Sequence, residues 1–211
     1  MSRALIIQCG HLYRPFSLYS GVIMKLFTSP FVAVLIIIML GIVSEEAKAG
    51  PQYDLVRAVE TQDIEKLISL LQTGVSPDTR KQSTGEPAIL IAATKGDLQI
   101  VKLLLENGAN ANYAHRRRGV TALMQRSIVG DTIMIKLLLA HGADPNRADI
   151  SQETPLLKAV KNRKLRAVKI LLAAGADPNV QDLTGKTALE YAKLSRSRRF
   201  VKMLQDAGAT Y

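Results

Sequence analysis

Residues 142–179 read GADPNRADISQETPLLKAVKNRKLRAVKILLAAGADPN, and the two ends of this stretch repeat each other. The motif Gly-Ala-Asp-Pro-Asn begins at Gly142 and again at Gly175, 33 residues later. Between the copies, Thr154-Pro155 is typical of a helix start, because the hydroxyl accepts from free amides of the first turn and proline suits the first helical position. A leucine-rich run, VKILLAAG, leads into the second copy. A fixed period of this length indicates a repeat architecture.

The same period runs through residues 51–211. A glycine closes a leucine-rich run five times, at spacings of 34, 34, 33 and 33 residues: Gly74, Gly108, Gly142, Gly175 and Gly208. A second series opens the segments PAIL, TALM, TPLL and TALE at residues 87, 121, 154 and 187. We expect each glycine to end a helix in the left-handed conformation. Three aspartates spaced by 34 residues are expected to cap the second helix of their units: Asp63, Asp97 and Asp131.

In this register the sequence resembles the ankyrin repeat, through the pattern G-x-T-P-L…A…G-D…I-V-K-L-L-L…G-A-D-P-N. The resemblance implies an all-α solenoid of about five units, each a helix-turn-helix plus a β-hairpin finger, stacked on its neighbours. The implied units are residues 50–82, 83–116, 117–150, 151–183 and 184–211, the first and last acting as caps. The position after Thr-Pro-Leu, commonly histidine in the family, holds Val56, Leu90, Met124, Leu157 and Glu190. We therefore expect packing to replace histidine hydrogen bonds between units.

The first 49 residues have the pattern of a targeting segment. The run FVAVLIIIMLGIV at residues 31–43 is uncharged, Met24-Lys25 precedes it, and Ala47-Lys48-Ala49 places small residues where a signal peptidase cleaves. Thirteen helical residues span about 20 Å, short of the hydrocarbon core. We predict a signal peptide at residues 24–49, cleavage after Ala49, and an uncertain upstream extension at residues 1–23. This implies export, to the periplasm or alternatively by secretion, without a stable membrane span.

Composition restricts the chemistry. The only cysteine is Cys9, so neither an intramolecular disulfide nor a cysteine metal site can form. Residues 50–211 contain His115 and His141, but no phosphate loop, His-Glu-x-x-His helix or Gly-x-Ser-x-Gly elbow. Asp78, Asp144 and Asp177 are interpreted as turn residues that recur at the repeat period. The sequence predicts a monomeric protein that is not an enzyme, needs no cofactor or metal, and binds another protein.

Candidate partner-binding residues follow from the register of the family, in which first-helix positions and fingers form a concave binding surface. We assign to it Ile91, Tyr113, His115, Arg116, Arg117, Arg118, Gln125, Arg126, Ile128, Val129, Lys158 and Lys161. The apolar members, Ile91, Ile128 and Val129, either form an exposed ledge for a partner or pack beneath the fingers. The sequence leaves both open.

Arg126 departs from the repeat, because the other units have alanine at its position: Ala58, Ala92, Ala159 and Ala192. We expect its guanidinium to reach the concave side near Arg118 and Ile128, held by Glu153, and to contribute to the partner site. The alternative is an outward-leaning arginine that binds nothing.

A second basic cluster, the basic edge, surrounds the helix–helix turns of the last two units: Arg163, Lys164, Arg196, Arg198 and Arg199. It is either a solvated face or a surface that attaches the protein to an anionic polymer or membrane. Nucleic acid is not expected, because no aromatic residues for base stacking accompany these arginines. The leading hypothesis is an exported scaffold, guard or inhibitor of another envelope or secreted protein, which it binds through its fingers and concave groove.

Overall fold

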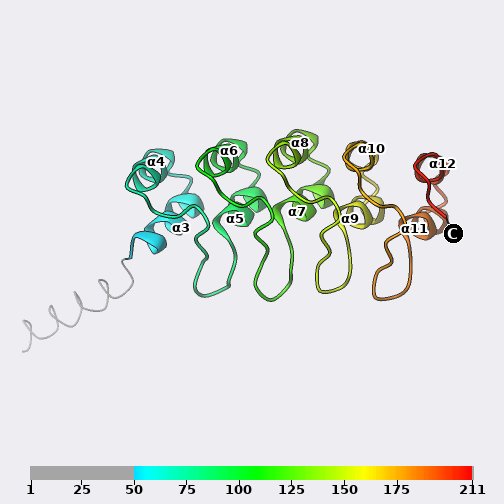
Figure 1. Ribbon diagram of the computed structural model, residues 1–211, viewed down its shortest axis with the longest axis horizontal. Coiled ribbons are helices and arrows are strands. Elements are labelled where there is room, and N and C mark those ends of the chain that lie inside the picture. The colour runs from blue at the N-terminus through cyan, green and yellow to red at the C-terminus, as the bar shows by residue number, and fades with distance from the viewer. Residues whose placement is uncertain (1–49, 211) are drawn as a thin grey trace, which may run out of the picture. The chain divides into compact units, whose positions relative to one another are not determined.

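Residues 50–210 are described in the computed structural model of the chain, and they form ten helices. The first helices of the pairs, here called inner helices, are α3 (Pro51–Thr61), α5 (Ala88–Lys95), α7 (Ala122–Val129), α9 (Pro155–Lys161) and α11 (Ala188–Leu194). The outer helices are α4 (Ile64–Gln72), α6 (Leu98–Glu106), α8 (Thr132–Ala140), α10 (Leu165–Ala173) and α12 (Arg198–Asp206). Figure 1 shows the pairs side by side, with all fingers extending to one side. The predicted all-α solenoid is confirmed; the predicted signal peptide, upstream extension and Cys9 lie outside the described residues.

Side-chain caps begin the helices where the sequence predicted them. The hydroxyls of Thr121 and Thr154 accept from the third amide of α7 and α9, each over 3.3 Å. Thr187 forms a capping box with Glu190, whose carboxylate accepts from the Thr187 amide over 2.6 Å. The three predicted aspartate caps are confirmed at α4, α6 and α8: Asp63, Asp97 and Asp131. The repeat period therefore fixes the N-termini of most helices through hydrogen bonds local in sequence.

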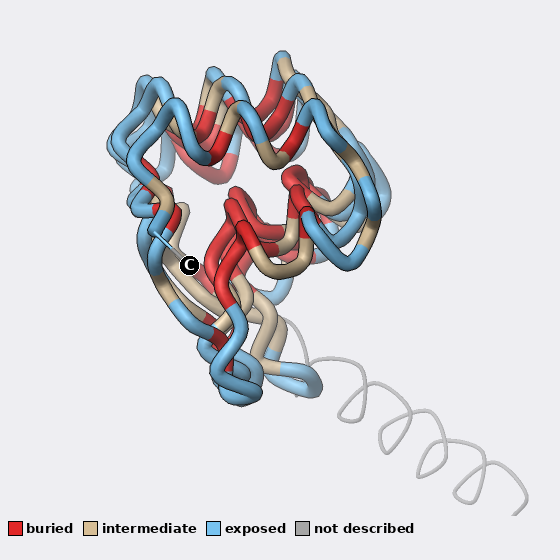
Figure 2. Tube along the Cα trace, turned by 90° about the vertical axis from the view of Figure 1, so that its right-hand side faces the viewer, coloured by how far each residue is buried: buried red, intermediate tan, exposed pale blue. Residues whose placement is uncertain are grey.

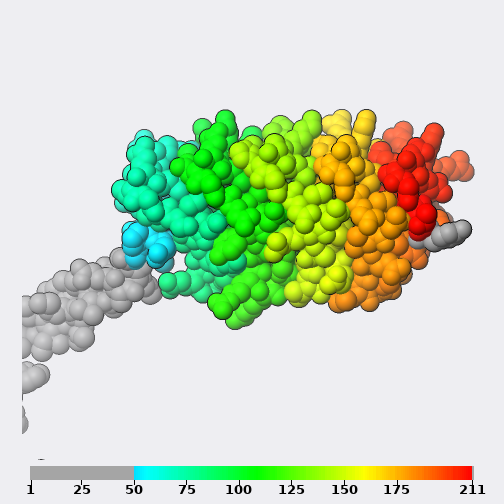
Figure 3. Space-filling model, viewed as in Figure 1, coloured from blue at the N-terminus to red at the C-terminus, as the bar shows by residue number. Residues whose placement is uncertain are grey.

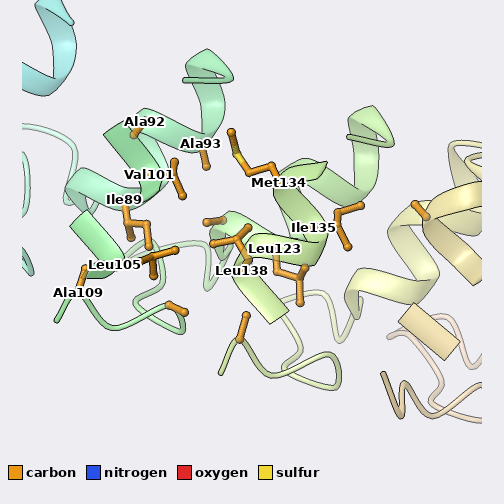
Figure 4. Close-up of a cluster of buried hydrophobic side chains, with 14 of the residues drawn as sticks. Ile89, Ala92, Ala93, Val101, Leu105, Ala109, Leu123, Met134, Ile135 and Leu138 are labelled. Carbon is orange, nitrogen blue, oxygen red and sulfur yellow. The ribbon is translucent and has the colours of Figure 1, made fainter. Parts of the chain in front are cut away.

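The core lies between the two rows of helices. Outer helices are buried on the side that faces the inner helices and exposed on the other, as Figure 2 shows. Figure 4 shows Ile89 and Leu123 of inner helices near Leu105, Met134 and Leu138 of outer helices. Four of the residues that replace the family's histidine are buried, which confirms that packing takes over there: Val56, Leu90, Met124 and Leu157. None of the helices in residues 50–210 is long and apolar enough to cross a membrane.

The fingers are hairpin-like loops with very little strand structure. Within residues 50–210, the single β-bridge joins Arg80 to Pro87. Later fingers close with two backbone hydrogen bonds across the turn, such as those from His115 N to Val120 O, 2.8 Å long, and from Gly119 N to His115 O, 2.9 Å long. The fingers therefore follow the course of the predicted hairpins but have almost no strand pairing. The returning limb is too short to form a strand, because Val120 is followed at once by the helix cap Thr121.

Asparagine side chains tie each finger base to the next unit. The amide of Asn112 donates to Gly142 O over 2.9 Å, while its Oδ1 accepts from Asp144 N over 2.7 Å. Asn146 and Asn179 repeat both contacts one and two units later. We call this series the asparagine ladder. It satisfies backbone groups that helix ends leave unpaired, and it makes each unit depend on its neighbour.

Asp78 occupies the first rung of this ladder, two residues out of register with Asp144 and Asp177. Ser76 has the turn role instead, because its hydroxyl accepts from Asp78 N over 3.3 Å, as Asp144 accepts from Asn146 N over 2.8 Å. The Asp78 carboxylate accepts from Asn110 N over 2.8 Å. The prediction that the three aspartates share one register is thus wrong. A carboxylate can accept but cannot supply the amide donor that the later rungs have.

We predict that Asp78→Asn stabilises the protein. The new amide can donate to Gly108 O, as Asn112 donates to Gly142 O, and a hydrogen bond of this kind contributes about 1 kcal/mol. The unfolding midpoint followed by circular dichroism should rise by about 2–4 °C. The reverse change, Asn112→Asp, should lower the midpoint by a similar amount. Equal midpoints for all three proteins would show that the amide donor contributes nothing.

Candidate functional site

Lys158 and Lys161, predicted to bind a partner, are already paired within the chain. Lys158 lies 2.7 Å from Asp149 Oδ2 and also contacts Glu153, which contacts Lys161 as well. Both acids belong to the finger that precedes α9, and the side chains of Asp149 and Lys158 are 5% and 15% exposed. The charge of Lys158 is therefore balanced inside the molecule. These contacts fasten the finger to the inner helix.

The network continues into the last unit through Asp182. Its Oδ1 accepts from the amides of Thr184 and Lys186, and its Oδ2 accepts from the Tyr191 hydroxyl over 2.5 Å. Lys161 lies 3.9 Å from the same Oδ2, and its Nζ is 4.6 Å from the centroid of the Tyr191 ring. We call Asp149, Glu153, Lys158, Lys161, Asp182 and Tyr191 the finger network. It connects two neighbouring units through their fingers and inner helices.

The carboxylates of the finger network have lowered pKa values. Burial alone would raise the pKa of Asp149, but hydrogen bonds from Lys158 and from two finger amides outweigh it and lower that pKa. For Glu153, burial is likewise outweighed by Lys158 and Lys161, so its pKa is lowered. Burial also opposes ionisation of Asp182, yet hydrogen bonds from Thr184, Tyr191 and the finger backbone hold its pKa far below the ordinary value. All three acids thus stay ionised at neutral pH.

His115 occupies the finger position of Asp149 and Asp182 and has the same structural role. It is 7% exposed, and its Nδ1 accepts from the amides of Arg117 and Arg118 over 3.1 and 3.2 Å. This burial leaves little of the His115 side chain accessible to a partner. Its imidazole holds the turn that presents the three arginines.

Tyr113 also supports its finger more than it exposes a binding face. Its ring is half-buried, and the guanidinium carbon of Arg80 lies over it, 3.6 Å from the ring centroid. Arg80 additionally donates to Ala114 O over 2.6 Å and to Gly85 O over 3.1 Å. One arginine therefore links two adjacent fingers through stacking and two backbone carbonyls.

Arg126 does not reach the concave side. It is 5% exposed; one guanidinium nitrogen donates to Thr94 O over 3.2 Å, and the other lies 3.9 Å from Asp131 Oδ2. Its Nε is buried and has no hydrogen-bond partner among the described residues. The prediction that Glu153 holds it is wrong, because Glu153 is bound by lysines and Arg126 turns toward the end of α5. Burial lowers the pKa of Arg126, and Asp131 partly offsets this.

The expected apolar ledge is only partly present. Ile91 belongs to the buried core, so for this residue the packed alternative is correct. Ile128 and Gln125 are half-buried, whereas Val129 is 49% exposed at the end of α7. The middle of the concave face therefore offers one exposed aliphatic residue and not a continuous strip.

The most exposed aliphatic finger residues are Ile150 and Leu183, which the sequence analysis did not single out. They are 64% and 71% exposed, and they occupy the same position at adjacent fingertips as the exposed Arg116. Backbone hydrogen bonds join these tips, from Ile150 N to Arg118 O over 3.2 Å and from Leu183 N to Ser151 O over 3.1 Å. We call Arg116, Arg117, Arg118, Ile150 and Leu183 the fingertip row. In the sequence, an aliphatic residue directly follows each of the finger aspartates Asp149 and Asp182, and this pattern could have indicated the exposed pair.

The basic edge is exposed at every member except Lys164, which is half-buried. The Lys164 stem covers Gly130, since a Cβ added there would lie 2.8 Å from Lys164 Cδ. Arg163 and Arg196 have φ of 58° and 52°, in a turn where the second and third units have glycine and the first has Gln62. A side chain in this conformation costs about 1 kcal/mol. The last two units accept that strain and place a guanidinium at each turn.

We predict that acid destabilises the array through the finger network. Because the folded-state pKa values of Asp149, Glu153 and Asp182 are lowered, their stabilisation is present above their unfolded values near pH 4 and is lost as pH falls further. Asp182→Asn should lower stability at pH 7 by about 1 kcal/mol and flatten the dependence of the midpoint on pH between about 5 and 2. Thermal unfolding at several pH values measures this. Asp206→Asn, at an exposed carboxylate, should leave the pH dependence steep; an unchanged slope in Asp182→Asn would contradict the prediction.

Comparison with known families agrees with this architecture. A family model described as ankyrin repeats in three copies matches residues 55–149, and another, ankyrin repeats in many copies, matches residues 138–192. The comparison with curated proteins gives no match. Residues 50–210 contain no group of three histidine, cysteine or acidic residues arranged to hold a metal ion. With ten helices in pairs, the asparagine ladder and these matches, the chain is an ankyrin-repeat protein, built on a scaffold that is typically non-catalytic and serves protein–protein interaction.

Proposed function

We propose that the chain is an exported protein-binding module that acts as a scaffold, guard or inhibitor of another envelope or secreted protein. The observation that carries this proposal is the fingertip row. Ile150 and Leu183 expose aliphatic side chains at adjacent tips, next to a finger with three exposed arginines. Exposed aliphatic residues gathered on one surface favour a contact with another protein.

The fingertip row suits a partner that presents an apolar patch beside acidic residues. Ile150 and Leu183 supply the area that a contact removes from water, which stabilises a complex by about 25 cal/mol per Å². Arg118 forms an ion pair with Glu86 over 3.3 Å. Arg116 and Arg117 form no ion pair with any of the described residues. Carboxylates on the partner would complement them and speed association.

Support within the array keeps this surface ready for binding. His115 fixes the turn of the arginine finger, the finger network fixes the next two, and backbone hydrogen bonds join the tips. A surface already held in place loses little conformational entropy when a partner docks. This favours binding as the task of the array over catalysis.

Export is the second part of the proposal, and the pattern of residues 24–49 supports it. We predict that the mature chain begins at Gly50, because Ala47-Lys48-Ala49 matches the small-residue cleavage site. The periplasm is the proposed destination, with secretion as the alternative. N-terminal sequencing of the protein from periplasmic and medium fractions measures both the start and the compartment. A chain that retains residues 31–43 in a membrane pellet would disprove cleavage.

We predict that the double variant Ile150→Ser, Leu183→Ser loses partner binding while staying folded. The fingertip ties use backbone atoms, so neither change removes a hydrogen bond. Losing two apolar contacts should weaken affinity roughly 10- to 100-fold. The measurement is capture of envelope proteins by the purified chain, with titration of each captured protein. Gln82→Ser, at the equivalent exposed position of the first finger, should bind as the unchanged protein does; unaltered affinity in the double variant would refute a fingertip site.

A further inference from the structure

A groove lies between the outer helices α10 and α12, away from the fingers. Its volume is about 460 Å³, and it is lined by Leu165, Arg198, Arg199, Lys202, Met203 and Asp206. Figure 1 shows the outer helices and the fingers on opposite sides of the array, and Figure 3 shows α10 and α12 at its orange and red end. The groove is therefore separate from the fingertip row and the finger network.

The groove combines an apolar floor with a cationic rim. Leu165 and Met203 are half-buried and pack against the core on one side. Arg198, Arg199 and Lys202 are exposed on α12. A ligand bound there would meet apolar contact below and positive charge around it, which is the chemistry of an anionic amphipathic group.

Arg198 is the rim cation that has no basic counterpart in the earlier units, whereas Lys202 aligns with Lys136 and Lys169, and Arg199 with Arg166. At the position of Arg198, the third and fourth units have Thr132 and Leu165, and at that of Arg199 the third has Ile133. Residues 155–211 carry twelve basic and four acidic side chains, a net charge of +8, whereas residues 50–154 carry twelve of each. The entire positive surplus of residues 50–211 thus lies within residues 155–211, and three of these basic side chains, Arg198, Arg199 and Lys202, line the groove. A potential of this kind attracts anionic partners.

Asp206 is the one acidic residue among the described residues of the lining, and it favours a ligand that carries a basic group among its acidic ones. The exposed carboxylate of Asp206 lies in the lining, among the cations. A peptide can place one basic side chain against this carboxylate, whereas a uniformly anionic surface, such as a bilayer of acidic lipids, has no cation to pair with it. A hollow with an apolar floor also suits protruding side chains better than a flat surface.

We propose that the α10–α12 groove is a docking site for an acidic, amphipathic protein segment. Apolar side chains of the segment pack on Leu165 and Met203, and its carboxylates pair with Arg198, Arg199 and Lys202. A basic residue near one end meets Asp206 and sets the direction of binding. This site goes beyond the proposed function, because it does not depend on the fingertip row.

A pair of synthetic peptides tests the site on the chain expressed with its own N-terminal segment. One is a labelled 14-residue helix-forming peptide with leucines on one face, glutamates on the other and a lysine near one end. The second has the same composition in scrambled order. Fluorescence anisotropy should show at least roughly tenfold tighter binding of the amphipathic peptide, since only it places apolar groups on the floor.

The matched substitutions are Lys202→Glu and Lys136→Glu. Lys136 occupies the same helix position in the third unit, so both variants change the net charge equally. Lys202→Glu should weaken binding of the amphipathic peptide at least roughly tenfold, and Lys136→Glu by less than about twofold. Circular dichroism of each variant confirms folding. The fingertip double variant should bind the peptide normally, which separates failure of this site from failure of the proposed function.

Four results would overturn the proposal. The first is absence of binding at peptide concentrations up to about 1 mM, and the second is equal affinity for both peptides, which indicates attraction by charge alone. The third is equal weakening by Lys136→Glu and Lys202→Glu. The last is binding to vesicles rich in phosphatidylserine without binding to the peptide, which would assign the basic edge to a membrane surface.

Discussion

Each unit of this protein has apolar side chains where it faces a neighbouring unit, and it can remove them from water only by stacking. The inner-helix alanines Ala58, Ala92, Ala159 and Ala192 are buried and small, which permits close approach of adjacent helices. Once neighbouring helices are that close, finger bases lie within hydrogen-bond reach. The asparagine ladder and the backbone ties between fingertips are therefore consequences of stacking, and each adds a further dependence of one unit on the next.

The polar contacts differ in kind along the array. The asparagine rungs Asn112, Asn146 and Asn179 are neutral and at least partly exposed, so each contributes little by itself. The finger network is buried and charged, and the cost of removing Asp149 and Lys158 from water offsets much of their attraction. Such a network is a weak source of stability but a strong constraint on geometry, because breaking one pair leaves a buried charge alone. Its effect is to fix two fingers over their inner helices and thus to hold Ile150 and Leu183 outward.

The sequence alone was sufficient for the backbone of the array and insufficient for several side chains. The period located the helix caps Asp63, Asp97 and Thr154, because caps act through hydrogen bonds within three residues. It failed for Arg126, whose surroundings come from another unit. A helix period gives the phase of a residue but not the direction that a long side chain takes between two neighbours. The prediction for Asp78 failed for another reason. Its residue type matches Asp144 and Asp177, and only its contact with Asn110 N shows that it occupies the position of the later ladder asparagines.

Because charge is unevenly distributed along the chain, the two proposed surfaces would attract their partners through different forces. Residues 50–154 are electrically balanced, so binding there depends on apolar contact and on the local arginines Arg116 and Arg117. Residues 155–211 hold the whole surplus, so a partner approaching the α10–α12 groove feels attraction before contact, and that attraction weakens with salt. A partner long enough to reach both surfaces loses its translational freedom only once, and its second contact forms at a high effective concentration. Two weak surfaces on one rigid array can therefore hold such a partner firmly, while proteins that match only one of them dissociate quickly.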